Sequence, residues 1–292
     1  MQVTMKGEQK RDEPLSLHTS MHTGGKADVF VLVEDMDDLL LVVSEVREIG
    51  IPCKVIGQGT NLLFSDDGFR GYIMKLGTDF AQMRIVNERV YAGSAAKLKD
   101  LVSTSVESSL SGLERLYGIP GSVGGAACTN AGAYGTYFAD LIKSVTGVDE
   151  EGNQITFMKD EIEFGYRRAV YPARIVITEV ELQLARGSRD ASLKLMEDCM
   201  AKRGRTQPLG ESTAGCIFKN PPSGISAAKL IEQCGLKGRR VGDAVVSSKH
   251  ANFIVNEGQA TTKEILELIR LIVDEVRTKM GVELSTEVEV VA

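Results

Sequence analysis

The sequence contains few of the residues that build disulfide frameworks and metal sites. Among 292 residues there are five cysteines and three histidines. The cysteine count is odd and no Cys-x-x-Cys pair occurs, so neither a disulfide framework nor a structural zinc site is expected, and no metal is assigned. Apart from Cys216, the cysteines are expected to be small buried apolar residues.

Long apolar runs and an excess of positive charge are also missing. The longest aliphatic stretch, Leu39 to Val43, is too short to span a bilayer, and Met1 to Pro14 lacks the apolar core of a secretion signal. The net charge of −6 argues against a nucleic-acid partner. We therefore expect a cytoplasmic protein without a membrane or nucleic-acid partner, and we expect a monomer.

Hydrophobic periodicity predicts a chain that mixes helices and strands, an α+β protein. Strands are expected at residues 27–33, 53–56, 72–76, 89–92, 174–184, 252–255 and 287–291, with a hairpin joining 145–148 to 154–157. Helices are expected at 35–49, 95–110, 191–202 and 226–233. Thr261 and Glu264 form a capping box that opens a further helix, which Gly281 ends.

The densest signal is a glycine-rich segment between residues 118 and 135. Its glycines stand at 118, 121, 124, 125, 132 and 135, and no charged residue lies among them. Such density indicates backbone conformations that a Cβ forbids, or a close approach of the backbone to a bound group. A second glycine loop, Gly57-Gln-Gly-Thr-Asn61, lies upstream.

Familiar nucleotide fingerprints do not account for these loops. Position 62 is Leu, so Gly57-x-Gly59 fails the Rossmann pattern, and no Gly-Lys-Ser/Thr follows any glycine run. Backbone N–H groups and small polar side chains are therefore expected to hold a phosphate-bearing cofactor, the side chains being Thr60, Asn61, Ser122 and Asn130. The alternative is that the glycines only mark tight turns.

A set of motifs in a fixed order resembles the family of UDP-N-acetylenolpyruvoylglucosamine reductases, also called UDP-N-acetylmuramate dehydrogenases. The matching segments cover nearly the whole chain: 17–28, 57–63, 112–121, 130–135, 164–167, 214–221, 227–235, 250–256 and 284–288. Little room lies between Arg167 and Arg203 for the long tyrosine-bearing substrate loop of some relatives. The chain therefore resembles the short form of the family.

The resemblance implies the fold, the domains and the reaction. It implies an FAD-binding fold of the vanillyl-alcohol oxidase type in two lobes, residues 1–78 (to which 284–292 return) and 79–203, with an α+β substrate-binding domain at 204–283. It also implies non-covalent FAD, NADPH as co-substrate, and reduction of UDP-N-acetylglucosamine enolpyruvate to UDP-N-acetylmuramate in peptidoglycan precursor synthesis.

Site residues follow from the matched motifs. The resemblance gives the catalytic residues as Arg167 and Glu287, at the substrate carboxylate, and Cys216, the proton donor where many relatives have Ser. The substrate-binding residues are Tyr166, Arg203 and Asn220. The cofactor-binding residues are Gly57, Gly59, Thr60, Asn61, Gly118, Ile119, Pro120, Gly121, Ser122, Gly124, Gly125, Asn130, Gly132, Ala133 and Tyr134. Departures from the usual pattern are Ala169, Thr286 and Glu289.

The chemistry explains the catalytic residues. Hydride addition to an enol ether places charge on the carboxylate end, so two groups must hold that charge and one acid must deliver a proton. A glutamate there must itself be protonated, which requires a raised pKa. A thiol, with a free pKa of about 8.5, is protonated near neutral pH.

Each of these assignments has an alternative. In the alternative interpretation, Cys216 is a buried structural cysteine, Arg167 is a strand-face ion-pair partner, and Glu287 is a solvated strand residue. Arg203 and Arg205 suit a phosphate or a helix C-terminus equally, and His250 is expected to be structural. Two alternatives concern the whole chain. One is a different flavoenzyme of this fold, in which Cys128 is the only candidate for covalent attachment of the flavin. The other is a non-catalytic nucleotide-sugar binding protein.

Overall fold

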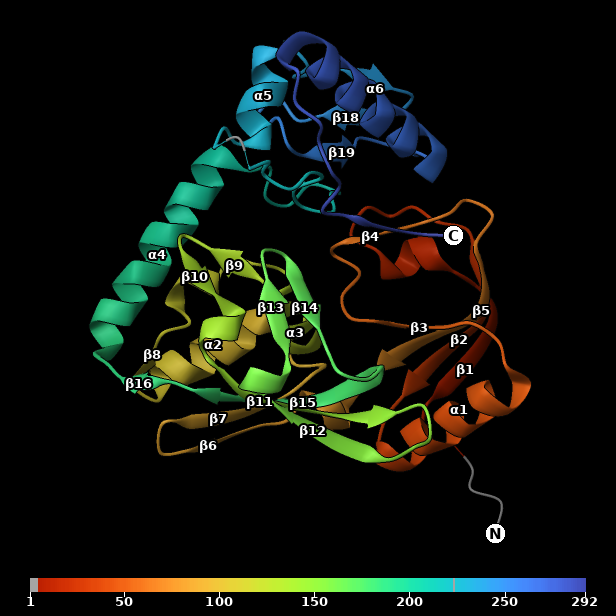
Figure 1. Cartoon of the computed structure of the whole chain (residues 1–292), viewed down its shortest axis with the longest axis vertical. Helices are drawn as coiled ribbons and strands as arrows, with labels where there is room; N and C mark the ends of the chain where they lie inside the picture. The colour runs from red at the N-terminus through yellow and green to blue at the C-terminus, as the bar shows by residue number, and fades with distance from the viewer. Residues whose placement is uncertain (1–4, 223) are drawn as a thin grey trace. The chain divides into compact units, whose positions relative to one another are not determined.

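A computed structural model of the protein describes residues 5–222 and 224–292, which form two compact units (Figure 1). Unit 1 contains residues up to 11, residues 29–58 and residues 71–201. Unit 2 contains residues 12–28, 59–70 and 202–292. Both units contain helices together with runs of consecutive strands, which confirms the α+β class.

Unit 1 contains an antiparallel sheet of five strands in the order β12-β11-β15-β7-β6. The strands are β6 (Met83–Val86), β7 (Arg89–Gly93), β11 (Ile142–Asp149), β12 (Gln154–Met158) and β15 (Ile175–Gln183). Helices α2 (Leu98–Glu107) and α3 (Val123–Thr129) share one hydrophobic core with this sheet. The predicted hairpin is confirmed, because Asp149 accepts the N–H groups of Glu151 and Asn153 in its turn.

A second sheet has the order β1-β2-β5-β3, and β3 runs parallel to β5. Its strands are β1 (Glu8–Pro14), β2 (Lys26–Val33), β3 (Cys53–Ile56) and β5 (Phe69–Leu76). Helix α1 (Met36–Ile49) packs on the unit 1 part of these strands. Asp35 caps its first turn, so the helix begins one residue later than expected, and Gly50, at φ 71°, ends it.

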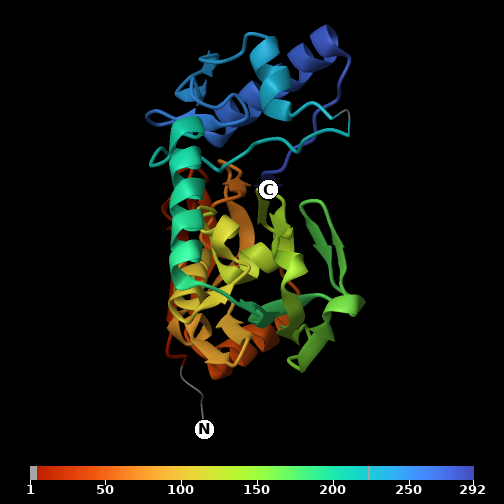
Figure 2. The same ribbon diagram turned by 90° about the vertical axis from the view of Figure 1, so that its left-hand side faces the viewer.

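Short strand pairs complete unit 1. These are β8 (Leu110–Ser111) with β16 (Ala185–Arg186), β9 (Gly132–Ala133) with β10 (Thr136–Tyr137), and β13 (Glu163–Gly165) with β14 (Arg168–Val170). Helix α4 (Arg189–Thr206) follows and is unbroken in Figure 2. Its first residues belong to unit 1, and those from Lys202 onward belong to unit 2.

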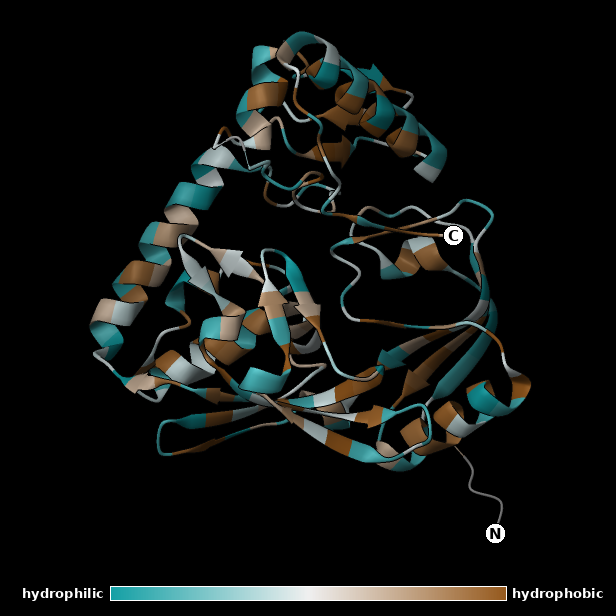
Figure 3. Ribbon diagram, in the orientation of Figure 1, coloured by the Kyte–Doolittle hydropathy of each residue, from teal (hydrophilic) through white to brown (hydrophobic). Residues whose placement is uncertain are grey.

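Unit 2 is built around a long amphipathic helix, α6 (Thr262–Met280). Its buried apolar residues, Ile265, Leu268, Ile269, Ile272 and Val276, recur at the spacing of one helix face. Figure 3 shows brown and teal residues alternating along this helix. The remaining elements are α5 (Ala227–Gln233), the antiparallel strands β17 (Arg240–Val241), β18 (Ala244–Val246) and β19 (Ile254–Asn256), and the parallel pair β4 (Leu62–Phe64) and β20 (Glu289–Val291).

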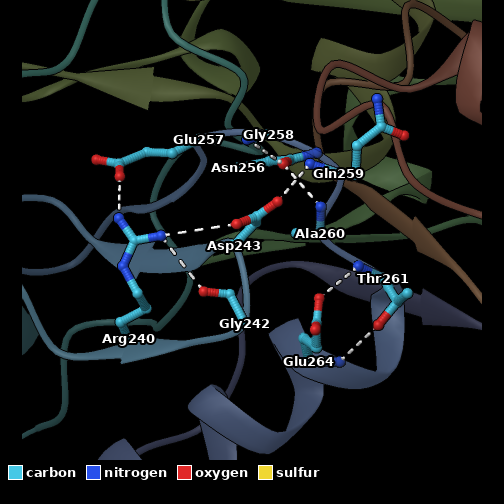
Figure 4. Close-up of polar contacts among 10 residues, drawn as sticks. All are labelled: Arg240, Gly242, Asp243, Asn256, Glu257, Gly258, Gln259, Ala260, Thr261 and Glu264. Carbon is cyan, nitrogen blue, oxygen red and sulfur yellow. Dashed lines mark hydrogen bonds and ion pairs between the residues drawn. The ribbon is translucent and has the colours of Figure 1, made fainter.

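The loop that leads into α6 is held by buried and surface polar contacts (Figure 4). The side-chain oxygen of Asn256 accepts the N–H groups of Gly258 and Ala260, at 3.1 and 3.0 Å. Asp243 accepts the N–H of Gln259 at 2.8 Å. These bonds satisfy loop donors that would otherwise lack partners and so fix where the helix begins.

Candidate functional site

The glycine-rich segment contains a helix that the sequence pattern does not predict. Ser122 caps α3, its hydroxyl accepting the N–H of Gly125 at 3.2 Å. Gly124 donates its N–H to the carbonyl of Ser94 at 2.8 Å, and a Cβ on Gly124 would lie 2.9 Å from the Cβ of Ser94. Part of the glycine content therefore serves backbone packing within unit 1.

Two of the predicted cofactor loops meet inside unit 1. A Cβ on Gly57 would lie 2.4 Å from the hydroxyl oxygen of Ser122, so only glycine allows this approach. The segment 118–135 adds no carboxylate that would repel a diphosphate. Small hydroxyl groups and backbone amides suit an anionic, phosphate-bearing group at this point.

The other predicted cofactor residues fall into two groups. Gly59, Thr60 and Asn61 belong to unit 2, where a Cβ on Gly59 (φ 64°) would lie 1.9 Å from the carbonyl oxygen of His18. The rest belong to unit 1: Gly118, Ile119, Pro120, Gly121, Ser122, Gly124, Gly125, Asn130, Gly132, Ala133 and Tyr134. Tyr134 has φ 52° and its hydroxyl donates to the carbonyl of Cys199 at 3.3 Å.

Arg167 lies in the two-residue turn of the β13–β14 hairpin. Gly165 pairs with Arg168, so Tyr166 and Arg167 form the loop between them. Arg167 adopts φ 55°, and its guanidinium carbon lies 5.5 Å from the ring centre of Tyr166. The neighbouring Arg168 makes a strand-face ion pair with Glu163, at 3.5 Å.

Unit 2 brings the segments of Cys216 and Glu287 together, although 71 positions separate them in the sequence (287 − 216). The N–H of Glu287 donates to the carbonyl of Ile217 at 2.7 Å, and Phe218 pairs with Thr286. Asn61 donates its side-chain N–H to the carbonyl of Glu287 at 3.1 Å. The segments that carry Cys216 and Glu287, the two predicted catalytic residues of unit 2, therefore lie next to each other and next to Asn61, a predicted cofactor residue.

Sequence reasoning missed Asn252 as a residue of this site. Its side-chain oxygen accepts the N–H of Phe218 at 2.9 Å, and its side-chain nitrogen donates to the carbonyl of Phe218 at 2.8 Å. Cys216 also pairs with Phe253. An uncharged polar residue in an apolar stretch, as in Ala251-Asn252-Phe253, was the available signal, because a buried amide needs partners.

The structure gives local contacts for the proposed substrate residues. Arg203 and Arg205 lie in the last turn of α4, a favourable place for positive charge. The side-chain oxygen of Asn220 accepts the N–H of Ala227 at 3.0 Å, at the start of α5.

His250 stacks edge-on against Phe253, with ring centres 4.8 Å apart. Burial lowers the pKa of His250 below its usual value of 6.5, and the charges of Lys237 and Arg203 act in the same direction. The imidazole is therefore suited to a neutral, packed state.

His18 and His22 have the i, i+4 spacing of a helical metal site, but the backbone between them does not form an α-helix. Residues Leu15–His18 form one short 3-10 turn, and His22 has φ 57°. His18 contacts Glu13 at 2.9 Å.

Across residues 5–222 and 224–292, no helix is long and apolar enough to cross a membrane.

Comparison with known proteins agrees with this architecture. Residues 27–157 match the family described as "FAD binding domain", and residues 207–291 match "UDP-N-acetylenolpyruvoylglucosamine reductase, C-terminal domain". Proteins named UDP-N-acetylenolpyruvoylglucosamine reductase from Heliobacterium modesticaldum and Clostridioides difficile are each 39% identical, over 98% and 99% of this chain and 91% and 95% of their own.

A crystal structure of the UDP-N-acetylenolpyruvylglucosamine reductase from Thermus caldophilus superposes with a TM-score of 0.85 at 36% identity. The match covers 99% of this chain and 100% of that one. The fold is therefore that of an FAD-binding domain followed by the C-terminal domain of these reductases. The chain belongs to the UDP-N-acetylenolpyruvoylglucosamine reductase family.

Proposed function

We propose that Arg167, Cys216 and Glu287 carry the chemistry of an FAD-dependent reductase. The enzyme uses NADPH to reduce UDP-N-acetylglucosamine enolpyruvate to UDP-N-acetylmuramate, a step of peptidoglycan precursor synthesis. The observation that carries the assignment is the pairing that joins residues 217–218, next to Cys216, to residues 286–287 in unit 2. We further propose that the enzyme acts in the cytoplasm as a monomer.

The residues present fit FAD. In unit 1 the meeting of Gly57 with Ser122 makes an uncharged loop pair suited to a diphosphate. In unit 2, Thr60 and Asn61 are the proposed contacts. When bound, FAD supplies a hydride that originates from NADPH.

Cys216 is the proposed proton donor. Once hydride has added to the terminal carbon of the enolpyruvyl double bond, the α-carbon carries the charge and needs a proton. The Sγ–H of Cys216 breaks, its proton forms the new C–H bond, and solvent returns a proton to the thiolate. A positioned acid of this kind contributes on the order of 10²- to 10⁴-fold to a rate.

Glu287 and Arg167 are the proposed groups at the substrate carboxylate. Arg167 supplies a permanent positive charge with a forked set of donors that matches a carboxylate. Glu287 acts as a protonated hydrogen-bond donor, so charge that develops in the reaction is held by two groups. Tyr166, Arg203 and Asn220 are the proposed contacts to the UDP-sugar.

An anaerobic stopped-flow experiment tests the reaction. The bound flavin is reduced with NADPH, and UDP-N-acetylglucosamine enolpyruvate is then mixed in. Rapid reoxidation without oxygen is the expected result. A flavin that is reduced but not reoxidised would instead point to another acceptor, and a protein that cannot be loaded with FAD would favour a nucleotide-sugar binding role.

A further inference from the structure

Asn130 occupies a specific place at the end of α3. It adopts φ 46°, the left-handed conformation in which Asn is among the few tolerated residues other than glycine, and it is only 5% exposed. Its side-chain oxygen accepts the N–H of Ala139 at 3.0 Å. Its side-chain nitrogen donates to the carbonyl of Gly165 at 2.9 Å.

These two bonds use both ends of the amide in one orientation. An N–H partner faces the oxygen and a C=O partner faces the nitrogen, so a flipped amide would lose both bonds. Asn130 therefore combines three properties: a left-handed backbone, an acceptor and a donor. Asp would retain the first two and replace the donor by an oxygen that repels the carbonyl of Gly165.

Gly165 is the last residue of β13 before the turn that carries Arg167. It pairs with Arg168, and only Tyr166 and Arg167 lie between them. The hydrogen bond from Asn130 is therefore attached directly to the base of the turn. A second bond, from the hydroxyl of Tyr171 to the carbonyl of Ala127 at 3.3 Å, ties the chain just beyond the hairpin to the same helix.

The hairpin needs such support. Arg167 has φ 55°, a left-handed conformation that is unfavourable for an ordinary side chain. The two strands of the hairpin, β13 and β14, have only three residues each. A hairpin of this size is marginal by itself, so tertiary contacts must select its conformation.

We propose that Asn130 is a positioning residue that ties the hairpin of Arg167 to the glycine-rich segment, with its main role toward the arginine and not toward the flavin. The inference rests on the proposed role of Arg167 at the substrate carboxylate. Asn130 thereby couples the order of the cofactor segment to the geometry of a catalytic turn within unit 1.

The test compares Asn130→Asp with Asn130→Gly and the wild type. Asn130→Asp removes the donor to Gly165, and Asn130→Gly keeps the left-handed backbone but removes both bonds. Thr129→Val is the matched control, because it removes the neighbouring bond from the Thr129 hydroxyl to Gly125 without touching the hairpin.

The first readout is trypsin cleavage after Arg167 and Arg168, followed by mass spectrometry on protein with and without FAD. Both Asn130 variants should be cut there about 10-fold faster than wild type, because loss of the hydrogen bond to Gly165 populates the open hairpin. The second readout is kinetic. Reoxidation by substrate should slow about 10-fold, a larger loss than any change in FAD affinity or in the rate of reduction by NADPH.

Three outcomes would overturn the proposal. Weaker FAD binding with unchanged cleavage would make Asn130 a cofactor ligand. Equal effects in Thr129→Val would make the bond merely a part of helix stability. Unchanged cleavage and kinetics would remove any role. Failure of the reaction in the wild type, with faster cleavage in the variants, would instead contradict the proposed function and leave the tether intact.

Discussion

The backbone N–H of Glu287 donates to the carbonyl oxygen of Ile217, the residue next to Cys216, over 2.7 Å. This bond fixes two distant segments of the chain in one register. A proposed acid and a proposed carboxylate-binding group are thus held by the backbone of unit 2, independently of any bound ligand. Backbone pairing of this kind positions side chains more rigidly than a loop does.

Replacing Cys216 separates the two half-reactions. Cys216→Ala should bind FAD and be reduced by NADPH like wild type, while reoxidation by substrate slows at least about 100-fold because the proton donor is gone. Cys216→Ser should keep measurable reoxidation through its hydroxyl. Stopped-flow absorbance of the flavin measures both steps.

Cys128→Ala is the control for this series, since Cys128 is an exposed thiol in the glycine-rich segment. It should leave both half-reactions unchanged and the flavin extractable after denaturation. Normal turnover in Cys216→Ala would refute the proton-donor assignment.

Gly57→Ala should weaken FAD binding by displacing Ser122. The new Cβ would stand 2.4 Å from the Ser122 hydroxyl oxygen, which must turn away and release the N–H of Gly125. Loss of such a cap costs about 1 kcal/mol. Fluorescence titration of the apoprotein with FAD should therefore give a dissociation constant raised at least about fivefold.

A double-mutant cycle with Ser122→Ala tests the mechanism of that effect. If Gly57→Ala acts through Ser122, the double variant should lose less affinity than the sum of the single variants. Gly204→Ala serves as the control, because its Cβ meets nothing nearer than 4.0 Å and it lies within α4. Strictly additive losses would argue against the Ser122 contact.

Asn252→Ala should destabilise the protein. The substitution leaves the N–H and the carbonyl of Phe218 without these hydrogen-bond partners, and both groups lie inside the core of unit 2. Each buried group without a partner costs about 1–3 kcal/mol, so a loss of about 2–6 kcal/mol in the free energy of unfolding is expected for the two groups. Urea denaturation measures it, and a loss below about 1 kcal/mol would contradict the stated role of this amide.

His250→Gln should alter the pH dependence of stability. The pKa of His250 is lowered in the folded state by burial first, so the unfolded chain takes up the proton at higher pH than the folded one. The wild type therefore loses stability as pH falls below about 6.5, and this loss should be smaller in the variant. Thermal unfolding at pH 7.5 and 5.5 compares them.

The exposed His22→Asn is the control for that comparison and should follow the wild-type pH dependence. An identical acid loss in His250→Gln and wild type would show that protonation of His250 does not contribute to it.

Much of the secondary structure was predictable because its causes are local. The capping box of Thr261 and Glu264, the apolar period of α6 and the left-handed Gly281 lie within one stretch of chain, and all appear as expected. The turn at Asp149 is local in the same sense.

Helix α2 shows where local reasoning fails. It begins at Leu98 and not at residue 95, because Lys97 pairs with Ser122 and keeps an extended backbone. Helix α3 was not foreseen, since its glycine content disfavours a helix unless tertiary contacts, such as that of Gly124 with Ser94, supply the stability.

The residue chemistry can be read along the chain: the glycine loops, the motif order that identifies the family, and the prediction that Arg167, Cys216 and Glu287 are catalytic. The register of Glu287 beside Ile217, and the bonds by which Asn130 and Asn252 hold neighbouring segments in place, are evident only in the folded chain. The physical reason is that hydrogen bonds between distant segments leave no periodic trace in the chain, because their geometry exists only after folding has brought those segments together.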